Sequence, residues 1–336
     1  MWKRARAVVA VLVVAAVVAA AAVTWRYQAF VETPLIVGEA GMVFTVPKGA
    51  TVESVAWMLA ERGTLEAPRY LKWMARLTGK ARRIQAGEYR IPPGTTPPEL
   101  LAKLTSGEVV QHALTVVEGW TFHELMDAVR SHEALVHTLK DVTPQAVMAR
   151  LGKPDEHPEG RFHPETYHFP RGTTDVEFLE RAYDAMAQRL AREWEAREEG
   201  LPLETPYQAL ILASIVERET GLPEERPRIA GVFIRRLDRG MRLQTDPTVI
   251  YGLGADFDGD IRYRDLRRDS PYNTYRRSGL PPTPIAMPSG ESIRAVLHPA
   301  DEDALYFVSR GDGSHHFSAT LEEHNRAVRR YQLGRN

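Results

Sequence analysis

The sequence predicts an α+β protein that is attached to a membrane by one N-terminal helix. Three observations support this prediction: an apolar run near the N-terminus, a strand–turn–helix pattern that recurs three times, and long helical stretches toward the C-terminus. A chain of 336 residues is longer than one typical domain, so we expect two or three folded units.

The N-terminal segment is typical of a membrane anchor. Basic residues lie within 1–6, residues 7–23 are only Ala, Val and Leu, and Trp25 and Tyr27 follow as candidate interface residues. We expect a cytoplasmic N-terminus over 1–6, a transmembrane anchor over 7–27 in the cell (inner) membrane, and a linker over 28–40. The alternative is a cleaved signal peptide with the small residues 19–22 as its cleavage site. In both cases the chain from Gln28 onward lies outside the cytoplasm.

The strand–turn–helix pattern defines the next region. Phe44–Gly63, Gly87–Val109 and Ala113–Arg130 each contain an alternating apolar stretch, a turn and an amphipathic helix. The similarity of PKGAT to PPGTT favours an internal relationship, although strand–turn–helix units are common. We expect this α+β region to cover residues 41–155.

A second region is expected over residues 156–336. It contains a long amphipathic helix, Asp175–Glu199, which Leu201 and Pro202 end. The next helix, Tyr207–Thr220, is apolar on nearly all faces. We therefore predict that this second helix is buried at the centre of its domain.

Two glutamates, Glu217 and Glu219, lie in the last turn of this central helix, just before Gly221. Burial and the negative end of the helix dipole both disfavour an ionised carboxylate there, as a general acid requires. The helical period alone does not choose between the two glutamates. The alternative is that both mark where the helix reaches the surface, paired with one of the following arginines, Arg226, Arg228 or Arg235.

Composition excludes several classes of function. The formal net charge of −1 lacks the basic excess of a nucleic-acid-binding protein, so no nucleic-acid partner is expected. The chain has no cysteine, which excludes disulfide bonds, cysteine-based metal sites and a cysteine nucleophile. The histidines match no standard metal-site spacing, so we assign neither a metal nor a cofactor.

Several long motifs resemble the endolytic murein transglycosylase (MltG or YceG-like) family. They are ASIVERET from Ala213, RLQTDPTVIYG from Arg242, YNTY with GLPP from Tyr272, and LYFVSRGDGSHHFSATLEEHN from Leu305. The segment EGRFHPETYHFP from Glu159 and the PKGAT region also resemble that family, so the resemblance spans almost the whole chain. It implies a LysM-like α+β module followed by an α+β catalytic domain.

The resemblance also implies an activity and a catalytic residue, Glu217. The family cleaves the MurNAc–GlcNAc bond of nascent peptidoglycan strands without water, which leaves 1,6-anhydro-MurNAc ends and terminates strand elongation. One carboxylate suffices for this reaction: Glu217 would protonate the leaving oxygen and then accept the proton of the substrate's own C6 hydroxyl. The expected partners are peptidoglycan strands, the cytoplasmic membrane and peptidoglycan synthases.

Further residues are candidates for contacts with sugar or peptide, or for support of the site: Glu219, Gln244, Thr245, Asp246, Tyr272, Asn273, Tyr275 and His315. Glu219 is expected to orient Arg218 or a loop amide. Asp246 can equally begin a helix, and the tyrosines can equally belong to the core. The chain departs from the family pattern at several positions: Glu165, Thr283, Met287, Ser289 and His316.

Two other functions remain open at this stage. One is a non-catalytic LysM-like adaptor that binds the wall and belongs to the cell-wall synthesis machinery. The other is a hydrolase with a second carboxylate, Asp246 or Asp269, which would leave a reducing end.

Overall fold

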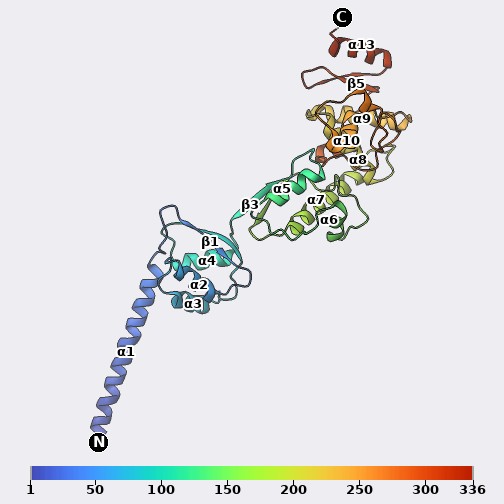
Figure 1. Ribbon diagram of the computed structural model, residues 1–336. Coiled ribbons are helices and arrows are strands. Elements are labelled where there is room, and N and C mark those ends of the chain that lie inside the picture. Colours follow the sequence, from blue (N-terminus) through green and yellow to red (C-terminus); the bar gives the residue numbers. More distant parts are fainter. Residues whose placement is uncertain (1, 335–336) are drawn as a thin grey trace. The chain divides into compact units, whose positions relative to one another are not determined.

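The computed structural model describes residues 2–334 and confirms a mixed helical and β-sheet chain (Figure 1). Two compact units form: unit 1 holds the chain up to His112 together with Phe169–Gly172, and unit 2 holds Ala113–His168 and the chain from Thr173 onward. The expected boundary between residues 155 and 156 lies inside unit 2. The segment after Ala113 packs with that unit, as the stacked rings of Phe122 and Phe162 show, at 5.9 Å between their centroids.

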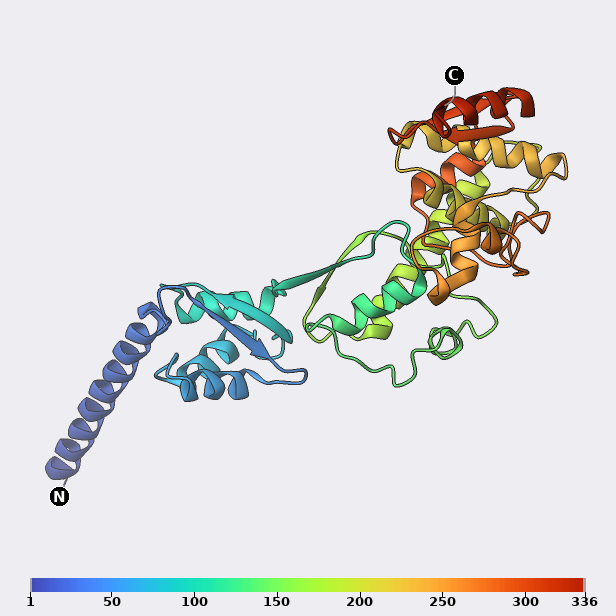
Figure 2. The same cartoon turned by 45° about the horizontal axis from the view of Figure 1, so that its top comes forward.

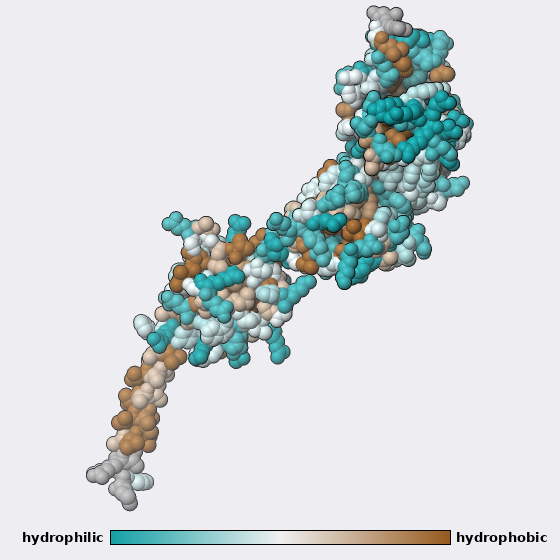
Figure 3. Space-filling model, in the orientation of Figure 1, coloured by the Kyte–Doolittle hydropathy of each residue, from teal (hydrophilic) through white to brown (hydrophobic). Residues whose placement is uncertain are grey.

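The N-terminal helix α1 (Trp2–Glu32) is one continuous helix with an apolar surface (Figure 3). Within its segment Arg6–Glu32, a window of 18 residues has a mean hydropathy of 2.8, so α1 is long and apolar enough to cross a membrane. The helix continues past residue 27, where the anchor was expected to end. Phe30 packs against the core of unit 1 and Leu35 is buried in it, so part of the expected linker is folded.

Unit 1 is a two-stranded sheet covered on one face by helices. Strands β1 (Met42–Val46) and β2 (Gly87–Ile91) pair antiparallel, with Phe44 opposite Tyr89. Three helices share a core with the face that carries these two rings: α2 (Val52–Glu61), α3 (Pro68–Leu77) and α4 (Pro97–Ser106). Thr51 and Thr96 form capping boxes at the starts of α2 and α4, which confirms the first two strand–turn–helix units.

Unit 2 begins inside the third strand–turn–helix unit, whose strand β3 (Gln111–Thr115) starts two residues earlier. The helix of this unit is α5 (Phe122–Ser131), which Thr121 caps. Strand β3 pairs with β4 (Thr166–Pro170), and α6 (Pro144–Arg150) lies between them in the chain. The expected long amphipathic helix is α7 (Asp175–Glu195), which ends at Glu195 rather than at Glu199.

The centre of unit 2 is α8 (Pro206–Glu219), in which Ala209–Val216 are all buried, as predicted. Helices α7, α9 (Arg226–Asp238), α10 (Asp246–Leu253) and α12 (Gly290–Leu297) contact it (Figure 2). The remaining elements are η1 (Pro223–Glu225), η2 (Gly254–Asp256), α11 (Tyr263–Leu266), the hairpin β5 (Tyr306–Ser309) and β6 (His315–Ser318), and α13 (Leu321–Tyr331).

Candidate active site

Helix α8 places Glu217 and Glu219 at its C-terminal end. The helix begins at Pro206, preceded by Thr205, whose side chain accepts a hydrogen bond from the Gln208 backbone N–H at 3.2 Å. The two glutamates lie about 200° apart around the helix axis, because each residue adds about 100°. They therefore face different surroundings.

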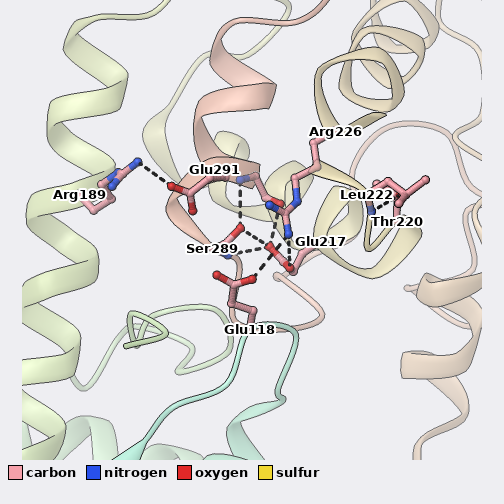
Figure 4. A network of polar contacts seen from close by, with 9 residues as sticks. Glu118, Arg189, Glu217, Thr220, Leu222, Arg226, Ser289 and Glu291 are labelled. Carbon is pink, nitrogen blue, oxygen red and sulfur yellow. Dashed lines mark hydrogen bonds and ion pairs between the residues drawn. The ribbon is translucent and has the colours of Figure 1, made fainter. Parts of the chain in front are cut away.

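Glu217 is held by the N-terminus of α12. Its Oε2 accepts hydrogen bonds from the Ser289 backbone N–H at 2.8 Å, from the Ser289 hydroxyl, and from the Ser292 hydroxyl at 2.7 Å (Figure 4). The Glu217 side chain is only 6% exposed. Ser289 is also the N-cap of α12, so the positive end of that helix dipole faces the carboxylate. The position of one carboxylate oxygen is thus fixed by three donors.

The other oxygen of Glu217, Oε1, faces Arg226 at the start of α9. The Arg226 Nη2 atom lies 3.5 Å from Glu217 Oε1 and 3.6 Å from Glu118 Oε2. Figure 4 shows both carboxylates pointing toward this guanidinium. The ion pair that was considered as the alternative to a catalytic role is therefore present, but it involves only one oxygen of Glu217.

Glu118 is a second carboxylate beside the site. It is 49% exposed, whereas Glu217 is almost fully covered. Partial burial raises the pKa of Glu118, the negative charges of Glu217 and Glu291 raise it further, and the charge of Arg226 lowers it. The two carboxylates that share Arg226 therefore form an electrostatically coupled pair.

The loop that carries Glu118 is fixed to the rest of unit 2. The Gly119 N–H donates to the Met287 carbonyl at 2.9 Å, and the Met287 N–H donates to the Trp120 carbonyl at 2.6 Å. Arg218 of α8 donates from Nη1 to the Gly119 carbonyl at 3.2 Å. These bonds hold the Glu118 loop against the end of α8 and the segment before α12.

Glu219 faces a separate cavity of about 500 Å³. Its partner is the Thr245 hydroxyl, which donates to Oε1, and not Arg218 or a loop amide as was expected. Burial of the carboxyl group raises the pKa of Glu219 to about 7; the Thr245 bond opposes this shift and the charge of Asp246 adds to it. Five of the predicted residues line this cavity: Glu219, Gln244, Asp246, Tyr275 and His315.

The wall of this cavity is ordered by short polar contacts. The Tyr275 hydroxyl donates to Asp246 Oδ1 at 2.6 Å, and His315 lies with Nδ1 2.7 Å from Glu225 Oε2. Gln244 has a φ of +52° and is the single non-glycine residue with positive φ within 2–334. Such backbone conformations occur often at binding sites, so Gln244 is a notable feature of the lining.

Three predicted residues lie inside the fold instead of lining the cavity. Thr245 and Asn273 are buried, and the Asn273 amide donates to the backbone carbonyls of Leu266 at 3.0 Å and Arg268 at 2.7 Å. The Tyr272 hydroxyl lies 2.9 Å from the Thr283 hydroxyl. In the structure these three side chains support the loops around the site.

Sequence reasoning missed the closest neighbours of Glu217. Ser289 was noted only as a departure from the family pattern, and Ser292 and Glu118 were not considered. A usable signal was present, because SGES at Ser289 has the pattern of a helix N-cap, and a helix N-terminus stabilises a nearby carboxylate.

Comparisons with known proteins agree with the motifs. A family model described as the YceG-like family matches residues 44–330. A Bacillus subtilis (strain 168) protein named endolytic murein transglycosylase is 32% identical over 308 residues, which cover 87% of this chain and 85% of the relative. A Streptococcus pneumoniae serotype 2 protein of the same name is 27% identical over 318 residues, and the match covers 84% of this chain and 57% of that relative. The crystal structure of a yceG-like protein from Listeria monocytogenes aligns with a TM-score of 0.55 and 28% identity, covering 86% of this chain and 100% of the other.

Proposed function

This chain belongs to the YceG-like family, and from that premise we propose that it is a membrane-anchored endolytic lytic transglycosylase of peptidoglycan. It cleaves MurNAc–GlcNAc bonds in nascent glycan strands, leaves 1,6-anhydro-MurNAc ends and so terminates strand elongation. The observation that carries the proposal is the Glu217 carboxyl group, with Oε2 held by three donors and Oε1 on the side of Arg226 and the partly exposed Glu118.

In the first step Glu217 acts as the general acid. A proton passes from Glu217 to the glycosidic oxygen, the bond between that oxygen and C1 of MurNAc breaks, and positive charge develops on C1. The fixed position of the carboxyl group favours transfer to one oxygen of the bound strand. Glu118 supplies a negative charge beside the site, which stabilises an oxocarbenium-like state.

In the second step Glu217, now a carboxylate, accepts the proton of the C6 hydroxyl of the same MurNAc. The bond between O6 and C1 forms, the anhydro ring closes, and Glu217 regains the proton that it gave. The nucleophile belongs to the substrate, so its effective concentration is high and no water enters the reaction. This explains how one carboxyl group serves both steps.

The cavity beside Glu219 is the proposed binding site for a further part of the strand. Its lining combines the aromatic rings of Tyr275 and Tyr306 with amide and carboxyl groups, a combination that suits sugar or peptide groups. It is connected to the reaction site through η1 and α9, since Glu225 contacts His315 and the next residue, Arg226, contacts Glu217.

The anchor and the first folded unit complete the proposal. Helix α1 crosses the cell membrane with its N-terminus in the cytoplasm, and unit 2 works outside it; the apolar length of α1 supports this arrangement. Unit 1 contains the region predicted to be LysM-like, and we propose that it binds glycan strands. Work beside peptidoglycan synthases fits an enzyme that cuts nascent strands.

Digestion of purified peptidoglycan by the full chain, followed by mass spectrometry of the products, tests the activity. Internal cuts with 1,6-anhydro ends are expected. Reducing ends would instead identify a hydrolase, and intact strands bound by the protein would identify a wall-binding adaptor. Either of these results would overturn the proposed reaction.

A further inference from the structure

A series of aromatic rings connects the end of α1 with α3 of unit 1. The Tyr70 ring of α3 lies 6.2 Å from Tyr27 and 5.5 Å from Phe30, both on α1, and 5.7 Å from Trp73 on its own helix, measured between ring centroids. Figures 1 and 2 agree that α3 lies beside the C-terminal turns of α1, on the side toward the apolar part of that helix. Unit 1 therefore presents α3 at the depth where the anchor would leave the membrane.

The surface of unit 1 near this point exposes large apolar side chains. Trp57 of α2 is 47% exposed, Trp73 is 49% exposed and Leu77 is 80% exposed. Trp57, Tyr70 and Trp73 also line a shallow cavity of about 760 Å³. Grouped exposed apolar side chains of this size on a folded unit mark an interaction surface.

The same surface is basic. From Val52 to Arg83, the stretch that holds α2 and α3, the sequence contains seven basic and three acidic residues, although the whole chain has a formal net charge of −1. Lys72 pairs with Glu53 at 2.6 Å, but no acidic side chain within 2–334 forms an ion pair with Arg69 or Arg76. These two guanidinium groups lie on the same helix as Trp73 and Leu77.

We propose that this aromatic–basic face, formed by Trp57, Arg69, Trp73, Arg76 and Leu77, docks on the outer surface of the membrane that α1 crosses, against anionic phospholipid headgroups. Tryptophan prefers the headgroup level of a bilayer, and basic side chains are attracted to anionic lipids there. The ring contacts with α1 place the face next to that level. Unit 1 is then held on the membrane surface and is not suspended from a free tether.

The proposal goes beyond the enzymatic activity and rests only on the anchoring role of α1. The chain has no cysteine, so a single introduced cysteine carries a spin label at one known position. Leu77→Cys reports on the aromatic–basic face, Val43→Cys reports on the outward face of the sheet, where Val43 is 50% exposed, and Val13→Cys reports on the anchor. Collision of each label with dissolved oxygen and with a water-soluble nickel complex gives its depth in vesicles.

The full chain is reconstituted in vesicles of phosphatidylglycerol with phosphatidylcholine, and in vesicles of phosphatidylcholine alone. In the anionic vesicles the Leu77 label is expected to lose access to nickel and to gain access to oxygen, while the Val43 label stays in water. Arg69→Glu with Arg76→Glu is expected to restore nickel access at Leu77. Arg76→Glu alone is expected to restore part of that access, and Arg90→Glu, a single charge reversal on the outward face of the sheet, is its matched control and is expected to change nothing.

A Leu77 label that is as accessible to nickel as the Val43 label in both kinds of vesicle would overturn the docking face. Protection of Leu77 only when purified glycan strands are added would assign the face to glycan and would also overturn it. A Val13 label in water would refute the anchor together with the face, whereas an immersed Val13 label with an exposed Leu77 label would refute the face alone.

Discussion

Replacing Glu217 by glutamine tests the proposed chemistry with little change of shape. The amide oxygen can take the place of Oε2 and accept the three hydrogen bonds from Ser289 and Ser292. The amide NH2 then takes the place of Oε1, 3.5 Å from Arg226 Nη2, where two donors face each other. The variant therefore loses the acid and one charge-assisted contact, while the contacts that hold the end of α8 to α12 remain.

The expected size of each effect follows from these contacts. Loss of general acid–base assistance lowers the rate by at least about 10²–10⁴-fold. Loss of the contact between Glu217 and Arg226 lowers the free energy of unfolding by about 1–3 kcal/mol. Arg226 still has Glu118 as a partner in the variant. In a domain of about 150–250 residues, 1 kcal/mol corresponds to a change of about 2–4 °C in Tm. Activity should thus almost vanish in a folded protein.

The assay is release of 1,6-anhydro products from peptidoglycan, with circular dichroism and strand binding measured on the same preparation. Glu219→Gln is the matched control, because it makes the same substitution two residues later in the same helix and keeps an acceptor for Thr245. Near-normal activity of the folded Glu217→Gln protein would refute the mechanism. An equal loss in Glu219→Gln would move the catalytic assignment to that residue.

Two further predictions concern the surroundings of Glu217, and a third concerns Glu219. Ser289→Ala removes the hydroxyl donor to Glu217 and keeps the backbone N–H donor. It should lower activity by about 10–100-fold with an unchanged circular dichroism spectrum. Activity equal to wild type would contradict a role of Ser289 in holding the acid. Glu118→Gln removes the negative charge that the proposal places beside the developing positive charge, so it should lower kcat more than it changes KM; an unchanged kcat would contradict that role. The pKa of Glu219, raised to about 7 in the folded chain from 4.5, means that the stability it contributes is present below about pH 4.5 and is lost as the pH rises through about 7. The Tm of Glu219→Gln minus the Tm of the wild type should therefore be larger at pH 8 than at pH 5. The same difference at both pH values would contradict the raised pKa.

Much of the fold was predictable because local sequence signals decide it. Thr51, Thr96 and Thr121 each cap a helix after a strand and a turn, and the structure contains all three units. The sequence pattern did not show where the units divide. The third strand–turn–helix unit folds with unit 2, since the partners of its loop, such as Met287, lie far along the chain.

The sequence by itself determined the family, the apolar N-terminal helix, the buried central helix and the position of Glu217 at the end of that helix. Each of these features depends on the order of residues within one helix or one motif, so it can be predicted from a short stretch of the sequence. The tertiary structure decided what surrounds each glutamate. Ser289, Ser292, Arg226 and Glu118 come from three other segments, and only packing brings them to Glu217 while Glu219 turns to a separate cavity. The helical period separates the two side chains by about 200°, but the chemistry of each depends on long-range contacts that local order does not encode.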